Sequence, residues 1–140
     1  MDRVTLSALL FLAAVPASFA PARAADQCAL LTKTDAVKYL GAGASGGMHG
    51  EECVYTRGGS MLAVAALGGA HGLDIFSAFK GDKNAKAVPG LGFEAYFDDG
   101  TFVAMKNGRV LELDYGTGPQ DAKNMNPKLL EIAKLALSRM

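Results

Sequence analysis

The chain has 140 residues, 14 basic and 14 acidic residues, and 17 glycines. This length is enough for one domain but not for two. A neutral chain without a basic tract predicts no general affinity for nucleic acid or for an anionic membrane, so both classes of partner are excluded.

The N-terminus has the pattern of a secretory signal peptide. Arg3 precedes an apolar stretch over residues 4–15, and small residues follow at the two positions that signal peptidase reads. We predict a signal peptide over residues 1–24, cleaved after Ala24. This leaves one exported domain over residues 25–140, located in the periplasm or secreted.

Two alternatives for the N-terminus fit the residues less well. A membrane anchor needs about 20 mostly apolar residues, and this run is shorter and contains Pro16. A lipoprotein needs a small residue directly before the lipidated cysteine, but Asp26-Gln27 precedes Cys28. We therefore expect a soluble, monomeric protein with no stable membrane anchor after cleavage.

The chain has two cysteines, Cys28 and Cys53. In an exported chain two cysteines are expected to pair, because the compartment is oxidising. Their wide spacing differs from the C-x-x-C motif of redox-active pairs, so we predict a structural disulfide. The chain-entropy model assigns about 3.5 kcal/mol to such a cross-link.

The first predicted element is a helix that begins at Thr32. Asp35 completes a T-x-x-D capping pattern, and Gly41 provides the left-handed C-terminal stop. Residues 41–50 (GAGASGGMHG) are predicted to be a flexible loop.

Two strands are predicted next, over residues 52–57 and 60–67, joined by the turn Gly58-Gly59. The second strand is apolar throughout residues 61–67, which indicates that both of its faces are covered. A short helix over residues 73–80 follows.

The remaining strands are separated by clear turn signals. The second half of residues 88–97 begins a strand that turns at residues 98–100, and residues 101–106 form the next strand. Asn107-Gly108 is the strongest short hairpin signal. Residues 109–115 alternate between apolar and polar side chains, as in a half-buried strand.

In that last strand, the alternation turns Glu112 and Asp114 away from the main core. A final helix is capped by Asn126, with Pro127 at its first position. Its apolar residues recur at helical spacing and form one stripe.

These elements predict an α+β fold with the order α-β-β-α-β-β-β-α. We expect five strands in a mostly antiparallel sheet, because short hairpins link neighbouring strands. We expect the helices to cover one face of that sheet. The other face is then open or partly covered, and a ligand could lie there.

Four segments together resemble a family of bacterial exported proteins and lipoproteins that is known only as a domain of unknown function. They are CALLTKTDAVKYLG (28–41), ECVYTR (52–57), VPGLGFEAYF (88–97) and LLEIAKLALSRM (129–140). Phe93 stands where Asp is commoner in that family. The resemblance implies a PsbP-like α+β fold and the Cys28–Cys53 disulfide, and it implies no settled activity.

No motif predicts catalysis or a cofactor. Residues 41–46 match G-x-G-x-x-G, but a helix precedes them and a strand follows, which reverses the order that dinucleotide binding needs. Both cysteines are committed to the disulfide. Ser45 and Ser60 lack the base and the third group that activate a nucleophile. We expect a protein that is not an enzyme and holds no cofactor.

Three functions remain open. The first is a binding module for a protein, a peptide or a small apolar molecule, with Leu91, Phe93, Asp98 and Asp99 as candidate contact residues. The second is a secreted inhibitor of a hydrolase, which would use the loop at residues 88–93 or 98–100. The third is a copper or zinc carrier using Met48, His49 and His71, which are weak candidates because their spacing fits no regular metal site.

Overall fold

The structure is a computed structural model that describes residues 26–140. The predicted signal peptide over residues 1–24 lies outside the described residues. None of the helices in the described part of the chain is both long and apolar enough to cross a membrane.

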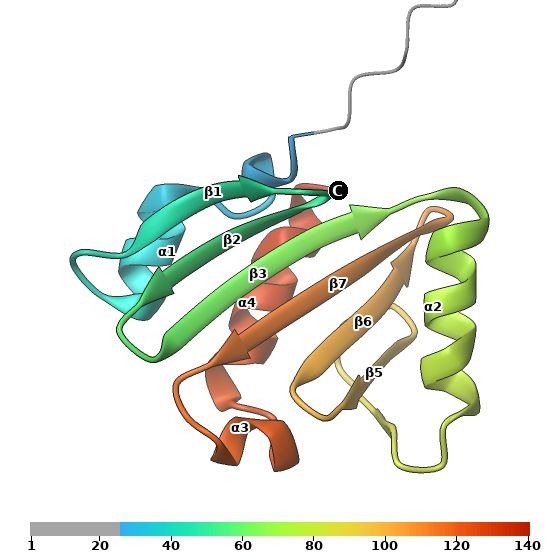
Figure 1. Cartoon of the computed structure of the whole chain (residues 1–140). Helices are drawn as coiled ribbons and strands as arrows, with labels where there is room; N and C mark the ends of the chain where they lie inside the picture. The colour runs from blue at the N-terminus through green and yellow to red at the C-terminus, as the bar shows by residue number, and fades with distance from the viewer. Residues whose placement is uncertain (1–25) are drawn as a thin grey trace, which may run out of the picture.

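The described residues form an α+β fold with one seven-stranded antiparallel sheet and four α-helices (Figure 1). In chain order the elements are the 3-10 helix η1 (Gln27–Ala29), α1 (Lys33–Leu40), β1 (Ser45–His49), β2 (Glu52–Arg57), β3 (Ser60–Leu67), α2 (Gly69–Gly81), β4 (Lys86–Ala87), β5 (Ala95–Asp98), β6 (Thr101–Lys106), β7 (Arg109–Gly116), α3 (Gln120–Lys123) and α4 (Pro127–Ser138). Across the sheet the strands run β1-β2-β3-β7-β6-β5-β4.

The prediction of five strands was wrong. The expected loop at residues 41–50 contains β1, and the two-residue strand β4 after α2 was not expected. β1 has a single large apolar residue, Met48, among glycine and polar residues, so no apolar alternation marks it as a strand. Backbone pairing forms it instead. A Cβ atom at Gly46 would collide with the carbonyl oxygen of Val54 on β2, so glycine permits this close approach.

Hairpin turns set the register of the sheet. Asn107-Gly108 joins β6 to β7, and both residues have positive φ (52° and 73°), as a tight two-residue turn requires. Asp99-Gly100 joins β5 to β6 in the same way, with φ values of 45° and 88°. These turns place Phe102 opposite Leu113 in the centre of the sheet.

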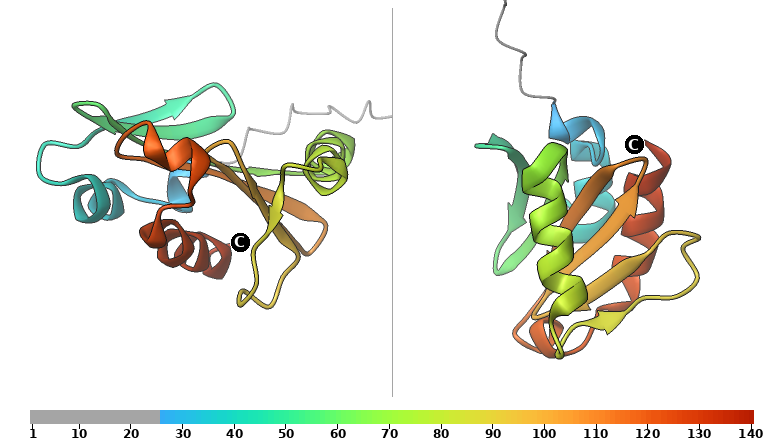
Figure 2. Two further views of the ribbon diagram at one scale, coloured as in Figure 1. Left: turned by 90° about the horizontal axis from the view of Figure 1, so that it is seen from below. Right: turned by 90° about the vertical axis from the view of Figure 1, so that its right-hand side faces the viewer.

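The main core lies between one face of the sheet and helices α1 and α4 (Figure 2). Most of its largest fully buried side chains come from the strands and from α4, as the apolar stripe of residues 129–137 predicts. They include Leu62, Val64, Phe102, Leu111, Leu113, Leu129 and Ile132. We call this side of the sheet the covered face.

The expectation that the helices share one face of the sheet was also wrong, because α2 lies on the other face. Its Phe76 packs against Val103 and Val110, whose side chains point away from the main core. Phe76 also contacts the Tyr96 ring edge to face, with the ring centroids 5.6 Å apart. Figure 2 (left) shows α2 across the sheet from α1 and α4. Its phenylalanines need an apolar surface, and β5–β7 provide one.

The predicted disulfide between Cys28 and Cys53 is confirmed, with the two Cα atoms 5.1 Å apart. It joins η1, which precedes α1, to β2. Gln27 strengthens the same attachment: its side chain accepts a hydrogen bond from Ala66 N at 2.8 Å and donates one to Ala66 O at 3.4 Å. The N-terminal segment is thereby fixed across β2 and β3.

Candidate functional site

The face of the sheet opposite the main core is only half covered. Helix α2 covers β5, β6 and part of β7 on this side, but none of the helices in residues 26–140 lies over β1, β2 and most of β3 (Figure 1). We call this uncovered part the open half-face. The alternation along each strand and the register between strands identify the side chains that point to this side. The central ones are Val54, Ala63, Ala65, Glu112 and Asp114.

Small apolar residues form the floor of the open half-face. Ala63 and Ala65 are 3% and 6% exposed because larger neighbours surround them. Across the ladder to β7, Ala65 pairs with Glu112 and Ala63 pairs with Asp114. Two carboxylates therefore lie directly beside an apolar floor, near the middle of a sheet.

The electrostatics of these carboxylates are unusual for surface residues. Burial raises the pKa of Glu112, and the nearby negative charges of Asp114 and Glu52 raise it further, while His71 partly offsets this. Burial also raises the pKa of Asp114, against a hydrogen bond of 2.6 Å from the Thr101 hydroxyl. Perturbed acids in a hollow are typical of functional sites, although structural networks also produce them.

No lysine or arginine of the described chain forms an ion pair with this acidic region, and His71 offsets the charge near Glu112 only in part. The three ion pairs of residues 26–140 join Lys38 to Glu131, Lys80 to Glu94 and Arg139 to Asp35. None of these pairs includes Glu52, Glu112 or Asp114. The open half-face therefore keeps negative charge that no lysine or arginine of residues 26–140 pairs with.

A hollow of about 270 Å³ lies where the open half-face meets α2, and we call it the α2 hollow. It is lined by His49, Glu51, Glu52, Ala65, Leu67, His71, Ile75 and Glu112. Its lining combines apolar residues with three glutamates and two histidines, and it contains no lysine or arginine.

The structure brings together two of the three candidate metal ligands. His49 and His71 line the α2 hollow, but Met48 does not. Met48 pairs with Cys53, whose side chain faces the main core, so it points to the other side of the sheet. Among residues 26–140, no three His, Cys, Asp or Glu side chains gather closely enough to hold a metal ion.

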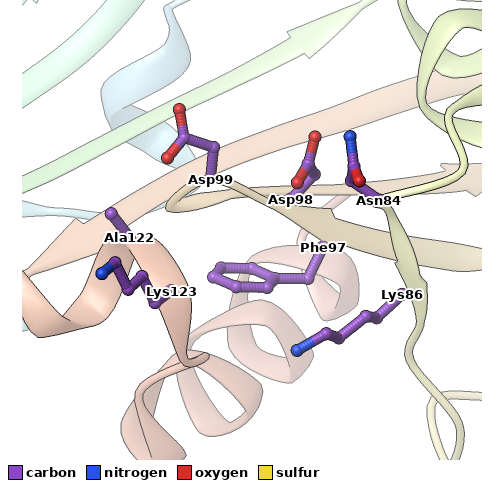
Figure 3. A pocket seen from close by; sticks show the side chains of 7 residues that line it. All are labelled: Asn84, Lys86, Phe97, Asp98, Asp99, Ala122 and Lys123. Atoms are coloured by element: carbon purple, nitrogen blue, oxygen red, sulfur yellow. The ribbon is translucent and has the colours of Figure 1, made fainter.

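The four candidate contact residues separate into two places. Asp98 and Asp99 line a hollow of about 450 Å³ between the β5–β6 turn and α3, which we call the turn hollow (Figure 3). Leu91 and Phe93 line a smaller hollow, of about 170 Å³, against the C-terminal end of α4. The sequence gives no reason to separate these residues, because all four lie within nine positions of one another.

Phe93 is exposed to 38% and is not isolated. The ammonium group of Lys106 lies 5.5 Å from the centre of its ring and donates a hydrogen bond of 2.6 Å to Leu137 O. The disulfide joins η1 to β2, so it does not brace the loop at residues 88–93 as an inhibitory loop would need.

Neither a protein-family model, nor a curated protein, nor a solved structure matches this chain. The resemblance to an exported family with a PsbP-like fold stays a prediction.

Sequence reasoning placed Glu112 and Asp114 on the outward side of β7 but did not select them as site residues. A usable signal was present in the neighbouring strand. The apolar run on β3 indicates two buried faces, and Ala63 and Ala65 supply the second one. The pairing of β3 with β7 could not be predicted from the sequence, because the two strands lie far apart in the chain.

Proposed function

We propose that this protein is an exported, non-enzymatic binding module whose open half-face takes a ligand with an apolar body and a cationic group. The observation that carries the proposal is the α2 hollow, where half-buried Glu112 lies beside an apolar floor and forms no ion pair with a lysine or arginine of residues 26–140. The export step rests on the signal pattern of residues 1–24.

The disulfide supports the proposed compartment. A disulfide such as Cys28–Cys53 fits an oxidising, extracytoplasmic environment, because thiols in the cytosol are kept reduced. Periplasm and extracellular medium share this property. The choice between them depends on the host cell envelope.

The chemistry of the hollow selects the ligand class. A cationic group placed beside Glu112 would compensate a charge that burial disfavours. An apolar body would cover Ala65, Leu67 and Ile75, which form the apolar part of the lining. A hollow of about 270 Å³ suits a small amine or a single basic side chain of a peptide.

The test is a titration of the disulfide-bonded protein with hexylamine, followed by amide chemical shifts. Hexanol, which has the same apolar body without the charge, is the matched ligand. We expect hexylamine to shift amides of β3, β7 and α2 at least about tenfold below the concentration that hexanol needs, since a charge-assisted contact is worth roughly 1.5–3 kcal/mol.

Two variants complete this experiment. Glu112→Gln should remove the preference for hexylamine over hexanol. Glu131→Gln, which removes an exposed carboxylate on α4 at the covered face, should leave it unchanged. Affinity should also fall as pH decreases through the raised pKa of Glu112. Equal binding of amine and alcohol, or no binding at all, would refute the proposal.

A further inference from the structure

Two hollows lie at opposite ends of β3. The α2 hollow includes Ala65 and Leu67 at one end, and a second hollow, of about 180 Å³, includes Met61 at the other. Because side chains alternate along a strand, these three residues and Ala63 all point to the open half-face. We call these four residues the β3 stripe. An apolar path therefore leads from one hollow to the other.

Two carboxylates of β7 border the β3 stripe, one at each hollow. Glu112 pairs with Ala65 and lines the α2 hollow, whereas Asp114 pairs with Ala63 and lines the second hollow. The two acids are two positions apart on one strand, so their side chains point to the same face from Cα atoms about 7 Å apart. Besides burial, the negative charge of Asp114 raises the pKa of Glu112, so the two carboxylates lie within electrostatic range of each other.

These two acids differ from freely solvated surface charges. Both are partly buried, and burial raises the pKa of each of them. The Thr101 hydroxyl donates a hydrogen bond of 2.6 Å to one carboxylate oxygen of Asp114, which orients this side chain and leaves its second oxygen available. Neither acid forms an ion pair with a lysine or arginine of residues 26–140. Two partly buried anions at a fixed spacing favour a ligand that brings two positive charges at the same spacing.

The β3 stripe determines what can join those two charges. Beside the carboxylates its surface consists of Ala63 and Ala65, which offer no polar side chain and favour contact with methylene groups. We propose that the open half-face binds a linear aliphatic diamine, with one ammonium group at Glu112, the other at Asp114, and the methylene chain over the two alanines. This inference rests on the proposed function, because the first ammonium group occupies the amine site of the α2 hollow.

The probe for this site is hexamethylenediamine, titrated into the disulfide-bonded protein and followed by amide chemical shifts. Hexylamine, which has the same carbon chain and only one ammonium group, is the matched ligand. We expect the diamine to bind about tenfold more tightly than hexylamine, since it adds a second charge-assisted contact within one ligand. The two equivalent ends of the diamine account for only about twofold of this gain. Aminocaproate, which has a carboxylate in place of the second ammonium group, should bind more weakly than hexylamine because Asp114 repels it.

Variants connect the second ammonium group to Asp114. Asp114→Asn should reduce the affinity for the diamine to about that for hexylamine. Asparagine has nearly the same shape and can still accept the hydrogen bond from Thr101, so the fold should be retained. Glu131→Gln, which removes an exposed carboxylate on α4, is the matched control and should leave the preference for the diamine in place. The comparison with aminocaproate tests the same contact in the unmodified protein, without any variant.

The outcomes distinguish this inference from the proposed function. A preference for the diamine that Asp114→Asn removes and Glu131→Gln retains supports the diamine site. If hexylamine binds at the α2 hollow and the diamine gains no more than its two equivalent ends provide, the amine site stands and the diamine site is refuted. The diamine site is also refuted if aminocaproate binds as well as the diamine, or if Asp114→Asn keeps the preference. If neither amine binds, both proposals fail.

Discussion

The two faces of the sheet differ in whether their buried polar groups have partners. On the covered face, buried polar atoms find partners: the hydroxyl of Tyr115 donates to Tyr39 O at 3.2 Å, and Gln27 forms two hydrogen bonds with Ala66. Nowhere in residues 26–140 does a buried side-chain nitrogen or oxygen lack a hydrogen-bond partner. On the open half-face, Glu112 and Asp114 are partly buried and form no ion pair with a lysine or arginine of those residues.

This difference separates the part of the molecule that stabilises the fold from the part that is available for binding. Burying a carboxylate without a compensating cation costs free energy of folding. On the covered face, partners offset the burial of polar groups. On the open half-face, burial disfavours the ionised form of Glu112. Groups that oppose stability in this way are typical of binding and catalytic sites. The comparison gives three predictions, taken from the largest effect to the smallest.

The largest effect is expected at the disulfide that attaches η1 to the sheet. Cys53 is fully buried, and its bond to Cys28 fixes the first described residues across β2 and β3. The Cys53→Ser variant should lose about 2–5 kcal/mol in free energy of unfolding. Urea denaturation measures this loss, and reduction of the unmodified protein should reproduce it. An unchanged midpoint would show that the covered face does not depend on the cross-link.

Much of the covered face was predictable from the sequence because its signals are local. The Thr32 and Asp35 pattern predicts the capping box that begins α1, and both hydrogen bonds of that box are present. Asn126 and Pro127 predict the start of α4. The apolar stripe that follows predicts the side of α4 that packs on the sheet.

The rest depends on contacts between distant segments. β1 has no apolar alternation, and only its pairing with β2 makes it a strand. The side of the sheet on which α2 lies depends on where β5–β7 place Val103 and Val110. The candidate site was missed for the same reason, since Ala65 and Glu112 become neighbours only when β3 pairs with β7.

An intermediate effect is expected at the ion pair between the ends of α1 and α4. Arg139 Nη1 lies 2.6 Å from Asp35 Oδ2. Burial alone would raise the Asp35 pKa, but the hydrogen bonds from Arg139 and Thr32 outweigh it and lower the pKa. The Asp35→Asn variant should therefore lose about 1 kcal/mol at pH 7.

The pH dependence of that difference follows from the lowered pKa. The stabilisation is present above the unfolded-state pKa of about 3.9 and disappears as pH falls through the lower folded-state value. Urea denaturation at pH 7 and at acid pH should show the gap between Asp35→Asn and the unmodified protein closing in acid. A gap that widened in acid would contradict the assignment.

The smallest effect is expected on the open half-face, and its sign is reversed. Because burial raises the Glu112 pKa, the folded state binds protons more readily than the unfolded state. The unmodified protein therefore loses stability as pH rises from the unfolded-state pKa of about 4.3 through the higher folded-state value. Glu112→Gln should gain a few tenths of a kcal/mol to about 1 kcal/mol at pH 7.

The reversed sign makes Glu112→Gln the sharpest test of the comparison. Its gain over the unmodified protein should shrink as pH falls through the raised folded-state pKa of Glu112 towards about 4.3, whereas the loss caused by Asp35→Asn should shrink only at lower pH, below about 3.9. Urea midpoints of the two variants and of the unmodified protein, measured at the same series of pH values, give both differences. If Glu112→Gln instead destabilised the protein at pH 7, the Glu112 carboxylate would have a stabilising partner. The open half-face would then resemble the covered face, and the case for a cation-binding hollow would fail.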